Sequence, residues 1–153
     1  MAISNDQELR KVLNELPATE QRDLGCRFVA SVRHLSEDPR IGQALEVIAE
    51  RSGQPDEMLS AYKGVKSLSN QTYTACGRDA DWAIQAEHFV AAAAAACLLP
   101  EGQISNNTNL AWKAAVQARM AKNCEMILND AGEVDNEAQK QYAIAEAFIS
   151  ENR

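Results

Sequence analysis

The sequence predicts an all-α fold: a single-domain helical bundle of six or seven helices around a central, alanine-rich antiparallel helix pair. Apolar residues recur every three or four positions along most of the chain. No stretch alternates between apolar and polar residues as a half-buried strand does. Alanine, the best helix former, is abundant, whereas aromatic residues make up only 5%. A length of 153 residues suits one core, so residues 1–153 are assigned to one domain.

The strongest helical pattern lies between Arg78 and Leu99 and includes six consecutive alanines at 91–96. A capping carboxylate and a proline are predicted to bound this helix: Asp79 or Asp81 at its start and Pro100 after its end. Because methyl groups let neighbouring helices approach closely, we expect other helices to enclose it on all sides. Its unbroken apolar run has 11 residues, about half of what a membrane span needs, so no membrane association is expected.

Four helices are predicted before this one, over about 5–16, 19–35, from 39 to a cap at Gly53, and 55–66. Ser4 and Gln7 have the spacing of a capping box, and Thr19 is placed to cap the second helix. Gly25 weakens that second helix unless another helix passes close to it.

The segment from Ser67 to Gly77 is the least periodic part of the chain, and its serines, threonines and asparagine favour turns. It is therefore predicted to be a loop with at most a short helical turn. Loops carry binding groups more often than core helices do, which makes it the first candidate for a mobile or functional segment.

Two further helices are predicted, over about 109–130 and 136–150, with Thr108 capping the first and Gly132 ending it. Large apolar residues recur along the first at helical spacing: Trp112, Val116, Met120, Cys124 and Ile127. Alanines at 111, 114, 115, 118 and 121 widen the predicted apolar surface. Trp82 and Trp112 each open an alanine-rich helix, which fits either an antiparallel hairpin or a faint internal repeat. Trp112, Met120 and the nearby alanines exceed what one bundle can bury, which favours a homodimer.

The formal net charge is −7, and residues 79–153, with 5 basic and 11 acidic residues, are the acidic half. Nucleic acid is an unlikely match for this charge, because phosphate binding needs clustered cations. The four cysteines at 26, 76, 97 and 124 are scattered, which argues against zinc and for reduced thiols in a cytoplasmic protein. The N-terminal residues MAISNDQEL lack the apolar stretch of a secretory signal. No cofactor is expected.

The two histidines each fit a catalytic and a structural interpretation. His34 lies near Glu37 and Asp38, which suits either an oriented general base or a cation at a helix C-terminus. His88 follows Glu87 directly, without the Glu-x-x-His spacing that places two metal ligands on one helical face. For both histidines the structural interpretation is favoured.

Two carboxylate pairs are spaced by four residues, Glu46 with Glu50 and Glu133 with Glu137, and so share a helical face. Magnesium-dependent helical hydrolases need several such pairs on facing helices, so solvated faces are the favoured interpretation. The chain has no Gly-x-Ser-x-Gly, glycine-rich phosphate loop or His-Glu-x-x-His motif. No catalytic, cofactor-binding or metal residue is therefore assigned.

The segments WAIQAEHFVAAAAAAC and NLAWKAAVQARMAKNC resemble the alanine-rich helices of bacterial toxin-neutralising immunity proteins. The resemblance covers about 82–127 and transfers no functional residue. The charge asymmetry and the lack of a catalytic constellation favour a non-enzymatic module that binds a protein partner, or itself as a homo-oligomer, through an acidic helical surface. The resemblance implies that such a module is toxin-neutralising. The alternative is a metal-dependent hydrolase that uses Glu46 and Glu50, with His34 or Glu87.

Overall fold

The computed structural model describes residues 2–50, 55–76, 81–129 and 136–152, and in them every regular element is a helix. Seven α-helices and two short 3₁₀ helices follow one another: α1 (Asp6–Asn14), α2 (Ala18–Ala30), η1 (Arg33–Leu35), α3 (Pro39–Glu50), α4 (Pro55–Cys76), α5 (Trp82–Cys97), η2 (Glu101–Gln103), α6 (Leu110–Leu128) and α7 (Glu137–Glu151). The predicted all-α bundle is confirmed.

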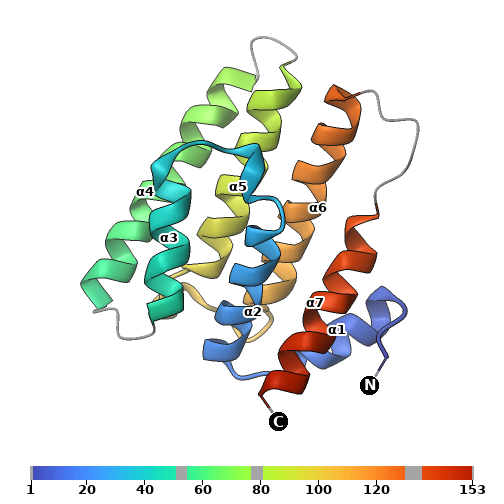
Figure 1. Cartoon of the computed structure of the whole chain (residues 1–153). Helices are drawn as coiled ribbons and strands as arrows, with labels where there is room; N and C mark the ends of the chain where they lie inside the picture. The colour runs from blue at the N-terminus through green and yellow to red at the C-terminus, as the bar shows by residue number, and fades with distance from the viewer. Residues whose placement is uncertain (1, 51–54, 77–80, 130–135, 153) are drawn as a thin grey trace.

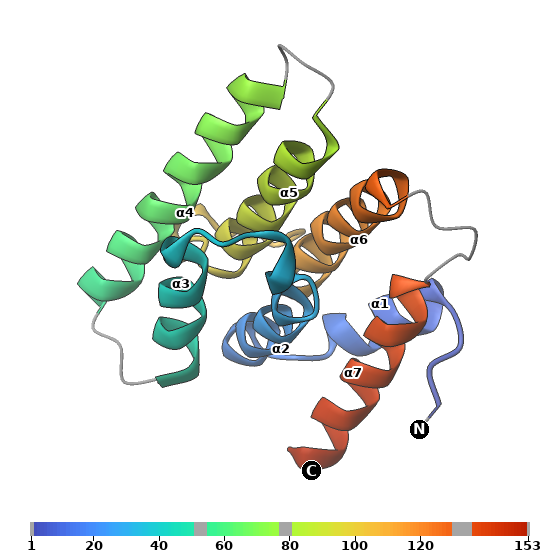
Figure 2. The same cartoon turned by 45° about the horizontal axis from the view of Figure 1, so that its top comes forward.

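The helices pack in two layers, which Figure 1 shows face on and Figure 2 tilted. One layer contains α4, α5 and α6, with α5 in the middle; the other contains α3, α2 and α7, with α1 beside α6 and α7. Antiparallel helices α5 and α6 form the most extensive helix pair. The predicted central alanine-rich pair is therefore confirmed.

Close contact of α2 with this pair depends on Gly25. A Cβ atom at this position would lie 2.8 Å from the Cys97 sulfur of α5, and 3.4 Å from the Cβ of Ala114 on α6. The distance to the sulfur is shorter than any ordinary van der Waals contact, so only glycine fits here without a shift of its neighbours. Gly25 was predicted to weaken this helix unless another helix passes close to it, and both α5 and α6 do so.

Side chains satisfy the backbone at both ends of α5. The Asp81 carboxylate accepts hydrogen bonds from the backbone N–H groups of Ala83 and Ile84, which confirms one of its two predicted caps; Asp79 lies outside the described residues. Arg22 of α2 reaches the other end and donates to the carbonyl oxygens of Cys97 and Leu99. The guanidinium thereby ties the start of α2 to the C-terminus of α5.

Three predicted caps are wrong by one or two residues. The Asn5 side chain, and not Ser4, accepts from the Glu8 N–H, and Asn109, and not Thr108, accepts from the Trp112 N–H. Helix α2 begins directly after Pro17, so Thr19 lies inside its first turn. It also ends at Ala30, and η1 occupies the end of the predicted span. Gly53 and Gly132 lie outside the described residues.

The predicted loop at Ser67–Gly77 is also wrong, because α4 continues through Cys76. Leu68, Ser69 and Thr72 are buried one and two turns beyond buried Val65, so tertiary packing extends the apolar face with small polar residues. The Thr72 hydroxyl donates to the Leu68 carbonyl oxygen at 2.7 Å, so its hydrogen-bonding capacity is satisfied within the helix. Polar groups that favour turns in isolation are thus compatible with a buried helical position.

Helix α6 buries only part of its predicted apolar surface. Its alanines at 111, 114, 115, 118 and 121 are fully buried, whereas Val116, Met120 and Ile127 of the predicted large apolar stripe are exposed and Cys124 is buried. Leu59 of α4 is exposed as well. The small residues face inward because they allow α2, α5 and α6 to approach, and the larger ones are displaced outward.

Replacing Gly25 with alanine is expected to lower the free energy of unfolding by about 1–3 kcal/mol, because the new methyl group overlaps the Cys97 sulfur. Gly102→Ala is the control, since nothing lies within 4 Å of a Cβ atom there, and its expected change is about 0.5 kcal/mol or less. Urea denaturation measures both variants. Equal losses at the two positions would show that α2 does not need its close contact.

Candidate interaction surface

The outer face of the α4–α5–α6 layer is not covered by the second layer. Helix α5 points Ala92 and Ala96 to this side, where both are half-buried, while Ala91, Ala93 and Ala94 are buried. The expectation that other helices enclose α5 on all sides is therefore wrong. Helices α4 and α6 flank it and α2 and α3 cover one face, which leaves one strip open.

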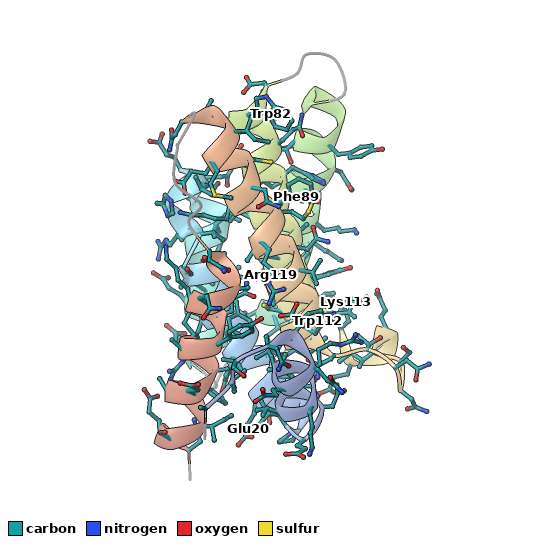
Figure 3. The ribbon with its side chains drawn as sticks, turned by 90° about the vertical axis from the view of Figure 1, so that its right-hand side faces the viewer. Glu20, Trp82, Phe89, Trp112, Lys113 and Arg119 are labelled. Atoms are coloured by element: carbon teal, nitrogen blue, oxygen red, sulfur yellow. The ribbon has the colours of Figure 1, made fainter. Side chains whose placement is uncertain are left out.

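A groove of about 370 Å³ follows this strip. Alanines of α5 form its floor, α4 and the start of α6 form its walls, and its lining comprises Tyr62, Lys66, Ser69, Ala92, Ala95, Ala96, Leu99, Trp112, Lys113, Val116 and Gln117. Figure 3 shows Trp112 and Lys113 near the start of α6, with Phe89 and Trp82 farther along α5 towards its N-terminus. The groove therefore spans the C-terminal half of α5.

The exposed large apolar side chains lie on the two helices that supply the walls, α4 and α6. In the described part of the chain, all the exposed ones belong to α4 or α6: Leu59, Tyr73, Val116, Met120, Ile127 and Leu128. Met120 is 42% exposed and Ile127 51%, one and three turns beyond Val116. Val116, Met120 and Ile127 form an exposed apolar ridge beside the groove, which is typical of a protein-binding surface.

The charges in the groove lining are positive. Lys66 on α4 and Lys113 on α6 stand on opposite walls, and both are exposed. Neither forms an ion pair within the described residues, and no aspartate or glutamate belongs to the lining. In a chain with a net charge of −7, this face differs in sign from the molecule as a whole.

One edge of the groove is fixed by a polar network that joins α1, α6 and α7. The Trp112 ring lies between two guanidinium groups, with Arg10 at 5.0 Å and Arg119 at 5.3 Å from the ring centroid. Arg119 donates to both carboxylate oxygens of Asp6 and to the Gln141 side chain. The Tyr142 hydroxyl also donates to Asp6. Hydrogen bonding to Arg119 lowers the pKa of Asp6 below its usual value despite partial burial.

His34 contacts α6 rather than the carboxylates near it in sequence. Its Nε2 donates to Glu125 at 2.6 Å, and Lys122 donates to the other oxygen of the same carboxylate at 2.5 Å. Burial alone would raise the pKa of Glu125, but these two hydrogen bonds outweigh it and lower the pKa. His34 is thus an exposed partner in a surface hydrogen bond between η1 and α6.

His88 of α5 links the helix to α4. Its Nδ1 donates to the Ser69 carbonyl oxygen at 2.8 Å, and its ring packs beside those of Tyr73 and Phe89. The neighbouring Glu87 accepts instead from the Ser36 hydroxyl, at 2.8 Å. Adjacent positions on one helix therefore contact different elements, and the two side chains do not form a joint site.

The candidate metal ligands do not gather. Glu46 and Glu50 lie exposed on α3, and Glu137 is buried and accepts from the Ser31 hydroxyl, while Glu133 lies outside the described residues. Within the described ranges, no group of three or more His, Cys, Asp or Glu side chains is arranged to hold a metal ion. The geometry thus gives the predicted hydrolase no ligand set in this part of the chain.

Cys26 and Cys97 are free thiols in the described part of the chain. Burial raises the pKa of Cys26 to about 11 and also raises that of Cys97. Both therefore carry protons at neutral pH, and thiols in this state are poor nucleophiles and poor zinc ligands. Their position between α2 and α5 is a packing position.

A second cavity, of about 790 Å³, lies at the end of the bundle where α2 begins and α5 ends. Apolar side chains from α3, α4 and the segment directly after α5 line it together with polar residues of α2 that include Arg22. Arg22 donates to the carbonyl oxygens of Cys97 and Leu99 at the end of α5, so its guanidinium group stabilises the fold at this position. No helix in the described ranges is both long enough and apolar enough to cross a membrane.

Comparison of the chain with protein-family models, curated proteins and solved structures gives no match. The geometry of the outer face is therefore the basis for a functional hypothesis. The sequence analysis did not identify the groove, although it did note that Trp112, Met120 and the alanines exceed what one bundle can bury. This surplus of apolar residues was the one indication of a binding surface in the sequence. Only the structure shows that the exposed part of it lies on the outward side of α6.

The ridge beside the groove is expected to tolerate a charge that the core does not. Met120→Glu should change the free energy of unfolding by about 0.5 kcal/mol or less, because the side chain is already exposed. Ala118→Glu, two residues away and fully buried, should cost about 3 kcal/mol or more through an unpaired buried charge. Urea denaturation compares them, and similar losses would contradict this orientation of α6.

Asp6→Asn is expected to destabilise the protein by about 1 kcal/mol at neutral pH, a small value because the carboxylate is nearly half exposed. Since the folded-state pKa lies below the usual 3.8, the ionised carboxylate stabilises the fold above that pH and loses this effect as the pH falls through the lower value. The difference from the parent protein should therefore shrink on acidification. Asp56→Asn, an exposed carboxylate, is the control. A difference that grew towards low pH would contradict the assignment.

Proposed function

We propose that this protein is a non-enzymatic interaction module that binds another protein, or a second copy of itself, through the outer face of α4, α5 and α6. The observation that carries the proposal is the exposed apolar ridge of Val116, Met120 and Ile127 beside an alanine-floored groove. An exposed apolar ridge of this kind costs solubility unless a partner covers it, so such surfaces are usually binding sites.

The electrostatic basis of the proposal differs from that expected from composition. The net charge predicted an acidic contact surface, whereas the groove lining contains Lys66 and Lys113 and no carboxylate. The apolar contact is therefore the main source of binding, and charge selects among partners. A toxin-neutralising role, which the resemblance of the two alanine-rich segments implies, is one form that this function takes.

No observation favours the hydrolase alternative. It needs Glu46 and Glu50 to converge with His34 or Glu87, but Glu87 is bound to Ser36 and His34 to Glu125. A partner-binding role needs no convergence of these groups. It requires only that the outer face be free, and in the described structure that face is exposed.

A photo-crosslinking amino acid at Met120 is expected to give a discrete protein adduct in the cells that produce this protein, because this position lies at the centre of the ridge. The same amino acid at Gln43, an exposed residue of α3 in the other layer, is the matched control and should give none. Gel electrophoresis and mass spectrometry identify the adduct, which is either a partner or a second copy. Absence of any adduct specific to position 120, in a protein that sediments as a monomer, would refute the proposal.

A further inference from the structure

We propose that the groove between α4 and α6 receives an amphipathic helix whose apolar side is bordered by acidic residues. This inference rests on the proposed interaction function and adds the chemistry of the partner. It is drawn from three features of the same surface: the shape of the groove, the small residues on its floor, and the sign of the charges on its two walls.

The shape fits a helix. Helices α4 and α6 lie on either side of α5, and the floor between them is lowered because α5 presents only methyl groups there. Ala92 and Ala96 are one turn apart, so they form a shallow channel along α5 in which a ridge of another helix packs closely. A helix laid in an apolar groove contacts it through residues at i, i+3, i+4 and i+7.

The walls provide an apolar contact for each side of such a helix. Tyr62 stands on the α4 side and Val116 on the α6 side, with Leu99 closing one end of the floor. Met120 extends the α6 wall beyond the groove, where it is 42% exposed. The apolar strip is thus narrow and bordered on two sides, which suits the single apolar stripe of an amphipathic helix.

The charges specify what lies beside that stripe. Lys66 and Lys113 stand on opposite walls without an ion-pair partner among the described residues, so a helix in the groove meets an ammonium group on each flank. Acidic residues on both flanks of the incoming helix satisfy both lysines, whereas basic residues there are repelled.

A second copy of this chain fits the same groove less well. If two copies met through this face, Lys66 and Lys113 of both would enter one interface, and the lining supplies no carboxylate to neutralise them. A flat anionic membrane also fits poorly, because the apolar floor lies between two walls. Both occupants are nevertheless outcomes that the experiment below detects.

The test uses a synthetic amphipathic peptide of about 18 residues, five helical turns, with alanine and leucine on one face and glutamate on both flanks. A matched peptide carries lysine in place of glutamate. The Trp82→Phe background leaves Trp112, which lines the groove, as the only tryptophan of the chain, so its fluorescence reports binding directly. The glutamate peptide is expected to bind, with an affinity that falls as salt is raised, and the lysine peptide is not.

Variants locate the site. Lys66→Glu and Lys113→Glu should each weaken the glutamate peptide about three- to tenfold, while Lys140→Glu, the same charge change on α7, should alter it about twofold or less. Ala92→Leu should also weaken binding, because a larger side chain raises the floor of the groove. Gln43→Leu on α3 is its control, with an unchanged affinity expected.

Several results overturn the inference: equal binding of the two peptides, equal effects of Lys66→Glu and Lys140→Glu, or no binding of the glutamate peptide at about 1 mM. Binding of anionic phospholipid vesicles in its place overturns it as well. Self-association that Met120→Glu abolishes, without peptide binding, refutes the acidic helix but supports the interaction function. A partner protein crosslinked at position 120, together with no peptide binding, likewise refutes the acidic helix and supports the interaction function.

Discussion

The structure depends on the close approach of three helices, α2, α5 and α6, at a contact rich in small residues. Gly25 meets Cys97 and Ala114 where these helices come together, and buried alanines continue the contact beside larger residues such as Val29 and Val90. Alanine loses no side-chain rotamer entropy on burial, and short distances between backbones increase dispersion contacts. The short distances between the helices therefore offset the small apolar area that each alanine side chain buries.

This choice of small residues at the centre determines the surface. Because alanines occupy the inward positions of α6, its larger apolar residues Val116, Met120 and Ile127 are left on the outward side. The same property of α5 leaves methyl groups at the open strip between α4 and α6, which produces a groove there. The apolar ridge and the groove are thus both consequences of the alanine core.

Much of the fold was predictable, because the evidence for it is local in the sequence. Periodicity identified the helices, Asp81 was recognised as a cap, and Gly25 was recognised as a position that needs a neighbour. Two errors have a common origin. On α6, a large apolar stripe and an alanine stripe share the helix, and only contact with α5 and α2 decides which is buried.

On α4, the serines and Thr72 suggested a loop, since isolated polar residues favour turns. Packing against α5 and a hydrogen bond from Thr72 to Leu68 override that preference. The groove was not predictable for the same reason, because its walls, floor and lysines come from three helices that are distant in sequence. His34, His88 and Glu87, which the sequence singled out, proved to have separate partners across the fold.

Native-state hydrogen exchange tests the central claim most directly, because it measures the opening free energy of each backbone amide. If the small-residue contact of α2, α5 and α6 holds the fold together, amides at 90–97 and 111–121 should exchange slowest, with one common free energy equal to that of global unfolding. Amides of α1, α7 and the outer turns of α4 should open at lower free energy. Amides of α1 or α7 that outlast those of α5 would contradict the account.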